Sequence, residues 1–295
     1  MIAALAILQN AIAAVVDVMD KFLISKRKIE PVSYTFFTVV TGAVVLLAWP
    51  WVFAHVSVRT VLLDLGAGAL FSLAYFIFFK TLAEGEVTRV VPFIFGLLPV
   101  FDLLLSALTG RNILTPQSLA AIMLLIPGAL LLSFRPGKYL HRHLLLKLLT
   151  ALLFSCYNFL WQYAAQEGPM LNNFMWNRLG AAGVLVALLV IPLVRAKVFK
   201  VDHVPHKRHT SFLFIFKQLL GGSNFIFLSF LLAVGNVVVI DSLLGFRYAF
   251  LFLFGLILSV KFKNILDEDL NRHIIIQKAA AIFLIFLGTI FLFLK

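Results

Sequence analysis

The sequence predicts an all-α integral membrane protein with ten transmembrane helices, arranged as two inverted five-helix repeats. Three observations predict this fold: the composition, ten long apolar segments, and an ordered likeness between the two halves. Hydrophobic residues make up 62% of the 295 residues and charged residues 13%, whereas a soluble domain has roughly 45–50% and about 25%. With a mean hydropathy of +1.03, the chain needs a bilayer as its solvent.

Ten continuous apolar segments predict the transmembrane helices. A bilayer core about 30 Å thick requires roughly 20 residues of helix, and continuous rather than alternating hydrophobicity favours helices over a barrel. The first segment has no basic leader and carries Asp17, so we interpret it as a retained helix rather than a signal peptide. The segments are 2–24, 33–54, 60–82, 88–109, 115–134, 145–165, 172–194, 212–233, 236–260 and 275–294.

The distribution of basic residues predicts the orientation of these helices. With ten spans, the connections on one side carry 14 Lys and Arg residues, and the other side with both termini carries 3. The positive-inside rule then places the basic connections in the cytoplasm and both termini on the extracytoplasmic side. We expect a plasma membrane, which in a bacterium is the inner membrane. The net charge of +12 is thereby explained by topology and anionic lipid, so no nucleic-acid partner is expected.

An internal likeness divides the chain at residues 1–137 and 138–295. The stretch from Gly85 and the stretch from Gly235 align in order, and Val16-Asp17 aligns with Tyr157-Asn158. Five spans is an odd number, so the second copy lies inverted relative to the first. Inverted repeats are typical of secondary transporters, whose substrate site lies near the midplane.

One stretch resembles a known family. Gly85-Glu-Val-Thr-Arg-Val-Val-Pro-Phe-Ile-Phe-Gly-Leu-Leu-Pro-Val-Phe, followed by Leu103-Leu-Leu-Ser-Ala-Leu, is similar to the fourth helix of EamA-like ten-span members of the drug/metabolite transporter superfamily. The sequence departs from that pattern at Thr109-Gly110-Arg111-Asn112, where many members carry Gly-Glu, and in the first helix, which lacks Trp-Gly. The resemblance implies secondary active transport of a small solute, commonly export, and its departures prevent transfer of a substrate.

Charged residues within the first helix are candidates for a polar site. An ionisable side chain at mid-bilayer costs about 2.5–3.5 kcal/mol on insertion scales, so it needs a partner, water or a function. Asp17 and Lys21 are four residues apart and share a helix face, where they can neutralise each other. In the matching helix Asn158 takes the place of Asp17, with Trp161 nearby. The alternative is that Asp17, Asp20 and Lys21 lie at the cytoplasmic interface.

Three further candidates lie deep in their spans. Asp102 has no charged residue three or four positions away, so it either binds a proton or forms an interhelical hydrogen bond. Arg178 lies seven residues into its span, and Arg247 with Tyr248 lies near the middle of another. Arginine keeps its proton and binds carboxylate or phosphate through two hydrogen bonds. Arg178 and Arg247 are therefore candidate anchors for an anionic substrate group; the alternative is an internal ion pair such as Arg247 with Asp102.

Enzymatic signatures are missing from the sequence. It contains no Walker loop, Gly-x-Ser-x-Gly or His-Glu-x-x-His, and the single Cys156 excludes an intramolecular disulfide. His203, His206 and His209 surround Pro205 in a basic loop, which favours a solvated segment over a metal site. We therefore expect no enzymatic activity, no cofactor and no metal.

These observations predict a secondary transporter that works by alternating access, as an exporter or exchanger of a metabolite or drug-like solute. The family resemblance places the cavity among the first, third, fourth, sixth, eighth and ninth spans. Asp17 or Asp102 is the expected carrier if transport is coupled to protons. Membrane lipid is an expected partner, and the sequence leaves open whether the chain forms a homodimer. Three alternatives remain: a lipid-handling flippase or enzyme acting on a lipid-linked phosphate, a non-transporting membrane partner, and a channel.

Overall fold

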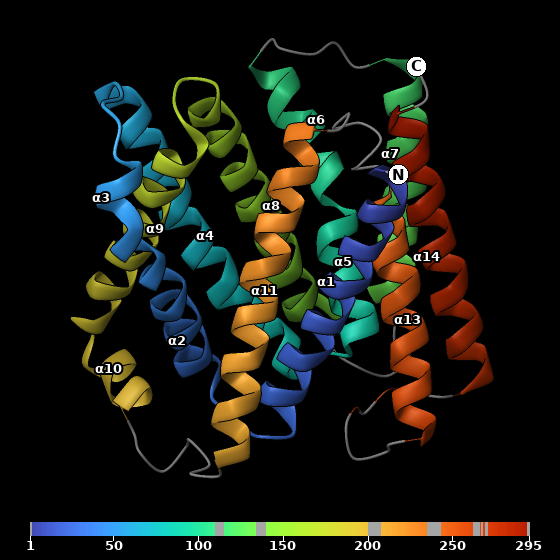
Figure 1. The fold of residues 1–295 in the computed structure, drawn as a ribbon. Helices are drawn as coiled ribbons and strands as arrows, with labels where there is room; N and C mark the ends of the chain where they lie inside the picture. Colours follow the sequence, from blue (N-terminus) through green and yellow to red (C-terminus); the bar gives the residue numbers. More distant parts are fainter. Residues whose placement is uncertain are drawn as a thin grey trace.

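The computed structural model describes residues 2–109, 115–133, 140–199, 208–234, 243–261 and 271–293, together with Leu266 and Glu268. Every secondary-structure element within these ranges is helical, so the prediction of an all-α protein is confirmed (Figure 1). The elements are α1 Ile2–Ser25, α2 Pro31–Ala43, a 3-10 helix Val44–Ala48, α3 Trp49–Val52, α4 Val58–Glu84, α5 Val87–Gly96, α6 Leu98–Leu108, α7 Pro116–Ser133, α8 Leu140–Ala165, α9 Met170–Leu189, α10 Pro192–Phe199, α11 Arg208–Val234, α13 Leu244–Lys261 and α14 Arg272–Phe293.

Most of the predicted spans coincide with helices that can cross a bilayer. Among the described residues, seven helical segments are long and apolar enough, or up to eight if α9 and α10 form one broken span. The two predicted spans outside this count are α1, which carries Asp17, Asp20 and Lys21, and α7, whose apolar stretch Pro116–Leu132 is shorter. That the chain has ten spans in two inverted repeats therefore stays a prediction.

Prolines break three of the predicted spans, because proline removes a backbone hydrogen bond and clashes with the preceding turn. The span expected at 172–194 ends at Leu189, and α10 leaves it at an angle of 105° just before Pro192. The span expected at 88–109 is interrupted at Leu97, before Pro99, which separates α5 from α6. A 3-10 stretch precedes Pro50 in the second span. All three are continuous apolar segments in the sequence, and in the structure the α-helix of each is interrupted.

Helix starts follow ordinary capping chemistry. The Glu30 carboxylate accepts hydrogen bonds from the backbone amides of Val32 and Ser33, and Pro31 occupies the first position of α2. Ser57 caps α4 by accepting from the Thr60 amide at 3.1 Å. Such caps satisfy amide groups that have no partner within the helix, and they fix where α2 and α4 begin.

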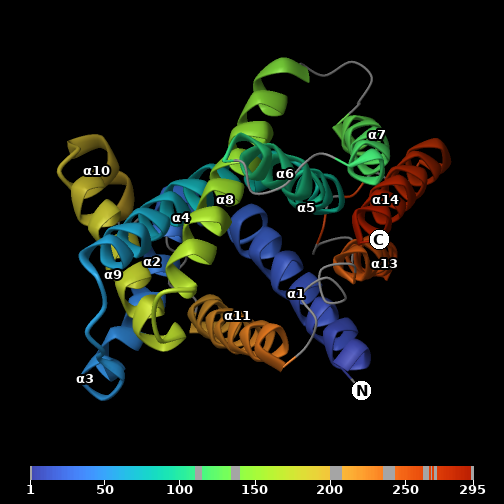
Figure 2. The same cartoon turned by 90° about the horizontal axis from the view of Figure 1, so that it is seen from above.

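Helices from the first half of the chain pack against helices from the second half, as Figure 2 shows from above. α4 lies against α8 and α9, α7 lies against α14, and α1 lies against α13 and α11. The α4–α9 contact is close because it is made through glycine: a Cβ on Gly68 would lie 1.9 Å from the Asn177 carbonyl oxygen, and one on Gly180 would lie 2.2 Å from the Leu65 carbonyl oxygen. Missing side chains let the two backbones approach.

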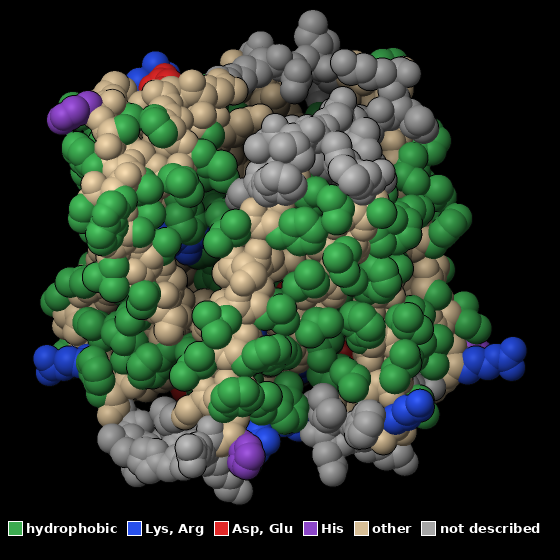
Figure 3. All heavy atoms as spheres, viewed as in Figure 1, with side chains coloured by type: hydrophobic (Ala, Val, Ile, Leu, Met, Phe, Trp, Pro, Cys, Tyr) green, Lys and Arg blue, Asp and Glu red, His purple; other side chains and the backbone are tan. Residues whose placement is uncertain are grey.

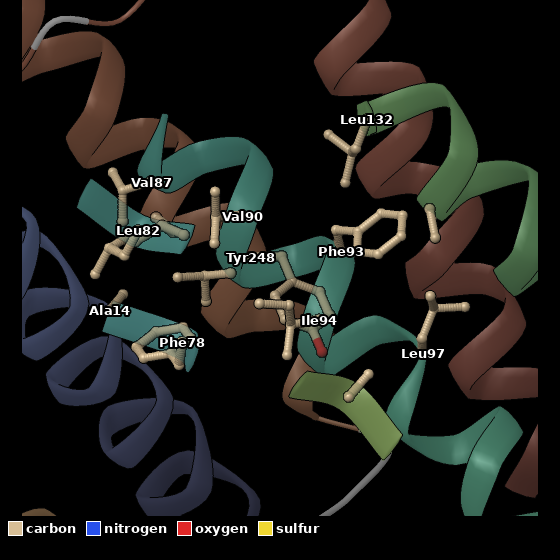
Figure 4. Packing of buried hydrophobic residues seen from close by; sticks show 14 of the residues in the cluster. Ala14, Phe78, Leu82, Val87, Val90, Phe93, Ile94, Leu97, Leu132 and Tyr248 are labelled. Carbon is tan, nitrogen blue, oxygen red and sulfur yellow. The ribbon is translucent and has the colours of Figure 1, made fainter. Parts of the chain in front are cut away.

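A hydrophobic core joins α1, α4, α5 and α13. Phe78, Val90, Ile94 and Tyr248 are among its buried members, and Figure 4 shows them pointing toward one another from these helices. The outer surface is also hydrophobic at mid-height. Figure 3 shows hydrophobic side chains covering the middle of the face, with Lys and Arg gathered mainly toward its lower margin. An apolar belt between polar margins fits a protein that a bilayer surrounds. The start of α1 and the end of α14 lie toward the same end of the bundle (Figure 1).

Candidate functional site

Arg178 on α9 lies in a box of aromatic rings. Its guanidinium carbon is 4.6 Å from the ring centre of Phe71 on α4, 4.5 Å from Phe174 and 5.8 Å from Phe225 on α11. The residue is only 7% exposed. Gly42 of α2 completes the enclosure, since a Cβ there would lie 3.5 Å from Nη1. Four helices therefore surround one cation that cannot lose its proton.

The guanidinium has no ion pair within the part of the chain that the structure describes, and its Nε has no hydrogen-bond acceptor there. Aromatic faces attract a cation, but they do not replace a carboxylate. Most buried polar groups in proteins are hydrogen-bonded, so a buried guanidinium without an acceptor needs an explanation. A carboxylate or a phosphate is the kind of group that a guanidinium binds through two hydrogen bonds.

Other buried polar atoms without partners gather on the same helices. They include both carboxylate oxygens of Asp64 on α4, both side-chain polar atoms of Asn177, Oδ1 of Asn173 and the indole nitrogen of Trp176 on α9, and Oδ1 of Asn224 on α11. Helix packing brings α4 and α9 together along this stretch. At mid-height of the face shown in Figure 3, to the left of α11, the atoms of a basic side chain are visible at the base of a hollow.

Asp17 on α1 and Arg247 on α13 form a bidentate ion pair. The Nε–Oδ2 distance is 2.9 Å and the Nη2–Oδ1 distance is 2.8 Å, and Arg247 also stacks over the Phe95 ring at 4.6 Å. Two sequence expectations are thereby corrected: Arg247 pairs with Asp17 rather than Asp102, and Asp17 does not pair with Lys21. Lys21 instead donates to the carbonyl oxygens of Leu82 and Ala83 at 2.8 and 3.2 Å, at the end of α4.

Tyr75 on α4 connects this ion pair with the Arg178 box. Its hydroxyl lies within electrostatic range of Asp17, Arg247 and Arg178, and its ring packs against Phe71 at 4.5 Å. Both arginines that the sequence singled out as anchors thus lie within electrostatic range of Tyr75, and Arg247 is already neutralised by Asp17.

Asp20 forms a second buried ion pair, one turn further along α1. Its carboxylate binds Lys217 of α11 at 2.6 Å, with both side chains 5% exposed, and accepts a hydrogen bond from the Tyr34 hydroxyl of α2. Lys217 also lies 5.4 Å from the Tyr34 ring centre. Asp20 therefore joins three helices in the protein interior rather than lying at an open interface.

A third charged cluster lies where α5 and α14 begin. Lys278 binds Glu86 at 2.5 Å and Glu268 at 2.6 Å, and Arg89 binds Glu86 at 3.0 Å. Burial raises the pKa of the Glu86 carboxyl, but the Lys278 ammonium and then the Arg89 guanidinium outweigh this and hold it below its ordinary value. The cluster ties the first half of the chain to the second half at this end.

The remaining predicted residues are distributed differently. Asp102 on α6 accepts a hydrogen bond from the Ser155 hydroxyl of α8, which matches the interhelical alternative. The Trp161 ring centre lies 6.4 Å from Phe174, next to the Arg178 box. Asn158 is exposed on α8, and Tyr248 is 1% exposed within the hydrophobic core. The structure therefore groups Trp161 with Arg178, and Asp17 with Arg247. Tyr248 is buried within electrostatic range of Arg247 and Asp17, whereas Asn158 lies outside both groups.

A cavity of about 570 Å³ lies elsewhere, at the turns after α1 and α4. Its charged lining includes Lys21, Lys28, Glu30, Glu84 and Glu86, and none of the residues around Arg178 contributes to it. Among the residues that the structure describes, no cluster of His, Cys, Asp or Glu can hold a metal ion. His203 and His206 lie outside the described residues.

The first half of the chain is similar to a known protein family. Residues 1–134 match the model of the EamA-like transporter family. The first half of the chain is EamA-like. The predicted resemblance to the drug/metabolite transporter superfamily is thereby confirmed for residues 1–134. The long apolar helices among the described residues support a multi-pass membrane protein.

The chain also resembles a solved structure described only as "Crystal structure of protein". The likeness covers 99% of this chain and 94% of that chain, with a TM-score of 0.51 and 18% sequence identity. At that identity it shows the fold alone. No curated protein sequence matches the chain.

Sequence reasoning missed three residues that the structure makes prominent: Asp64, Lys217 and Lys278. Asp64 is four residues into its expected span, and Lys217 and Lys278 are five and three residues into theirs. Charges so close to a span end are ordinarily assigned to the interface, where they snorkel to water. All three are instead nearly fully buried, because neighbouring helices extend past them.

Proposed function

We propose that this EamA-like protein is a secondary active transporter that carries a small organic anion across the plasma membrane by alternating access, as an exporter or exchanger. The observation that carries this proposal is the buried guanidinium of Arg178, enclosed by Phe71, Phe174 and Phe225 with no carboxylate among the residues described around it.

The proposal rests on an energetic argument. A guanidinium away from water costs free energy unless an anion compensates it. Here the protein supplies rings that hold the group in place but no anion, so a carboxylate or phosphate of the solute completes the site through bidentate hydrogen bonds. The phenyl rings and Trp161 surround the rest of the solute with apolar surface.

Paired contacts between the halves support alternating access. If 1–137 and 138–295 are inverted repeats, each inter-half contact needs a counterpart with the roles of the copies exchanged. Asp17–Arg247 joins the first span to the ninth, and Asp102–Ser155 joins the fourth to the sixth. Likewise Ser72 donates to the Ala181 carbonyl between the third and seventh spans, and Gln218 donates to Thr38 between the eighth and second. The family match also ends at residue 134.

Buried ion pairs between the halves concentrate at one end of the bundle. Asp20–Lys217 and Glu86–Lys278 both lie near the C-terminal ends of α1 and α4, on the side where α1 leads into the basic connection Lys26-Arg27-Lys28. At the opposite end, the corresponding pair is Arg59–Glu167 at 3.7 Å, which is largely exposed. We interpret this as a conformation closed toward the basic side, which the positive-inside rule assigns to the cytoplasm. Transport then requires these pairs to separate.

Intrinsic fluorescence offers a direct test, because two tryptophans adjoin the site. Trp176 precedes Arg178 in the chain and Trp161 contacts Phe174. The purified protein is titrated with glutamate, phenylalanine and glucose 6-phosphate, with glucose as the uncharged reference. We expect a saturable change with a carboxylate or phosphate ester and none with glucose. A carboxylate-only or phosphate-only response identifies the anionic group.

The variant Arg178→Ala is expected to lose the response, and Arg195→Ala is the matched control. Arg195 is an exposed arginine on the neighbouring helix α10, so its removal changes net charge equally without touching the site. A response that survives in Arg178→Ala contradicts the proposed anchor. If no panel member changes the fluorescence or exchanges across proteoliposomes, the lipid-handling alternative is favoured.

A further inference from the structure

Asp64 is a buried carboxylate that the anion site does not use. It is 0% exposed, and neither of its oxygens has a hydrogen-bond partner in the described structure. Seven of the other eight described carboxylates accept a hydrogen bond; Asp17, for example, has Arg247 on both oxygens. Asp64 thus differs from these seven in the part of the chain that the structure describes.

The position of Asp64 follows from the packing of α4. Gly66 lies against Leu160 of α8, and Gly68 lies against the backbone of Asn177 on α9. Asp64 is one helical turn before Gly68, so it shares the face that packs on α9. Along that seam Asn173 Oδ1 and Asn177 Oδ1 are buried acceptors without a donor in the described structure, and Asn177 Nδ2 is a buried donor without an acceptor. A carboxylate offers only acceptors, whereas a protonated carboxyl offers both a donor and an acceptor and so matches this mixed set.

The charged and titratable groups around α4 do not neutralise Asp64. Tyr157 of α8 is within its electrostatic range, but a neutral phenol supplies no positive charge. On α9, Arg178 is held among the aromatic rings. Arg59 and Glu167 pair with each other at the end of α4. The ionisable groups of α1 and α2 that face α4, namely Asp20, Lys21 and Tyr34, are engaged with one another or with the far end of α4.

Groups that contact water lie close to Asp64 at the nearby end of α4. Thr60 lies one turn from Asp64, about 6 Å along the helix, and its hydroxyl donates to Glu167 at 2.7 Å. Glu167 and Arg59 are exposed. Only one turn of helix therefore separates Asp64 from groups that contact water.

We propose that Asp64 is a proton-binding site, occupied in this conformation and emptied when the α4–α9 seam opens to water. The O–H bond of the carboxyl then breaks, the proton passes to water, and the carboxylate remains hydrated until the seam closes. A buried carboxyl without a cation stays neutral rather than ionised, so closure of the seam requires the proton. Resting on the proposed transport function, this makes solute movement dependent on a proton gradient.

Infrared titration of the purified protein tests the proton site without any solute. At neutral pH the wild type is expected to show the carbonyl stretch of a protonated carboxylic acid in an apolar environment. Asp64→Asn, which resembles the neutral form, is expected to lose that band, whereas Glu167→Gln, an exposed acid one turn away, keeps it. An unchanged band in Asp64→Asn overturns the proposal.

Flux in proteoliposomes tests the coupling, using whichever of labelled glutamate, phenylalanine or glucose 6-phosphate exchanges in the wild type. A pH gradient is expected to drive accumulation in the wild type. In Asp64→Asn the ratio of internal to external label is expected to fall to one, while exchange of the same label continues. Continued exchange also shows that the variant is folded. Continued pH-driven accumulation overturns the coupling. If no label exchanges, the transport function fails, and the infrared band still decides the proton site.

Discussion

Breaking the Asp17–Arg247 pair should destabilise the protein far more than removing both charges together. Asp17 is 4% exposed and Arg247 18% exposed, so each single neutralisation leaves the other charge buried. Removing one partner of a buried pair typically costs about 3–5 kcal/mol, whereas replacing both is often close to neutral. Asp17→Asn and Arg247→Gln are therefore each expected to cost about that amount.

The double variant Asp17→Asn/Arg247→Gln leaves no uncompensated charge. It still loses the contact between Arg247 and the Phe95 ring, which is 4.6 Å away and worth roughly 0.5–2 kcal/mol. We expect the double variant to be more stable than either single variant. The two single losses together minus the loss of the double variant should then give an interaction energy of at least about 4 kcal/mol, above the roughly 0.5–3 kcal/mol typical of residues in contact.

This double-mutant cycle is measured by thermal unfolding of the wild type, the two single variants and the double variant, all in the same detergent. At about 2–4 °C per kcal/mol, each single variant should unfold about 10 °C below the wild type and the double variant should recover at least half of that loss. Additive losses, with the double variant the least stable, would show that the two side chains do not interact and would refute the assigned pair.

Two further changes test the packing and the charged cluster. Gly180→Ala places a Cβ 2.2 Å from the Leu65 carbonyl oxygen and should cost about 1–3 kcal/mol through overpacking; Gly183→Ala, on the same helix with nothing within 4 Å, should gain roughly 0.5–1 kcal/mol from helix propensity. Equal effects on the unfolding temperature would contradict the close α4–α9 contact. The lowered pKa of Glu86 contributes stability above its ordinary value of 4.5, and this stability is lost as the pH falls through the lowered value. Lys278→Met should therefore be least stable relative to wild type near neutral pH, with a gap that narrows in acid; a gap independent of pH would exclude the assigned charge effect.

The sequence predicted the helical segments because each depends on local information. Apolar runs of about 20 residues identify membrane helices with little help from tertiary structure. Breaks near Pro99 and Pro192 also have local causes, but the 105° turn between α9 and α10 does not follow from a proline alone, since its direction depends on what α10 packs against.

The pairing of charges required knowledge that a sequence does not contain. Asp17 and Lys21 share a helix face, yet Asp17 binds Arg247, 230 residues away, because the relative register of α1 and α13 is set by their packing. Asp64 was missed for a related reason: its distance from the span end favours an interfacial site, whereas Gly66 and Gly68 bring α8 and α9 over it. Arg178 was found because arginine so deep in a span is unusual, and its aromatic neighbours came from three different helices.

Counterflow in proteoliposomes tests most directly whether this chain carries an organic anion at Arg178. Vesicles are loaded with unlabelled glutamate, phenylalanine or glucose 6-phosphate, and uptake of the same labelled compound is followed for wild type, Arg178→Ala and Arg195→Ala. We predict trans-stimulated uptake of at least one of these anions by wild type and Arg195→Ala, and its loss in Arg178→Ala. Uptake by Arg178→Ala equal to that of the wild type would contradict a carrier site at this residue.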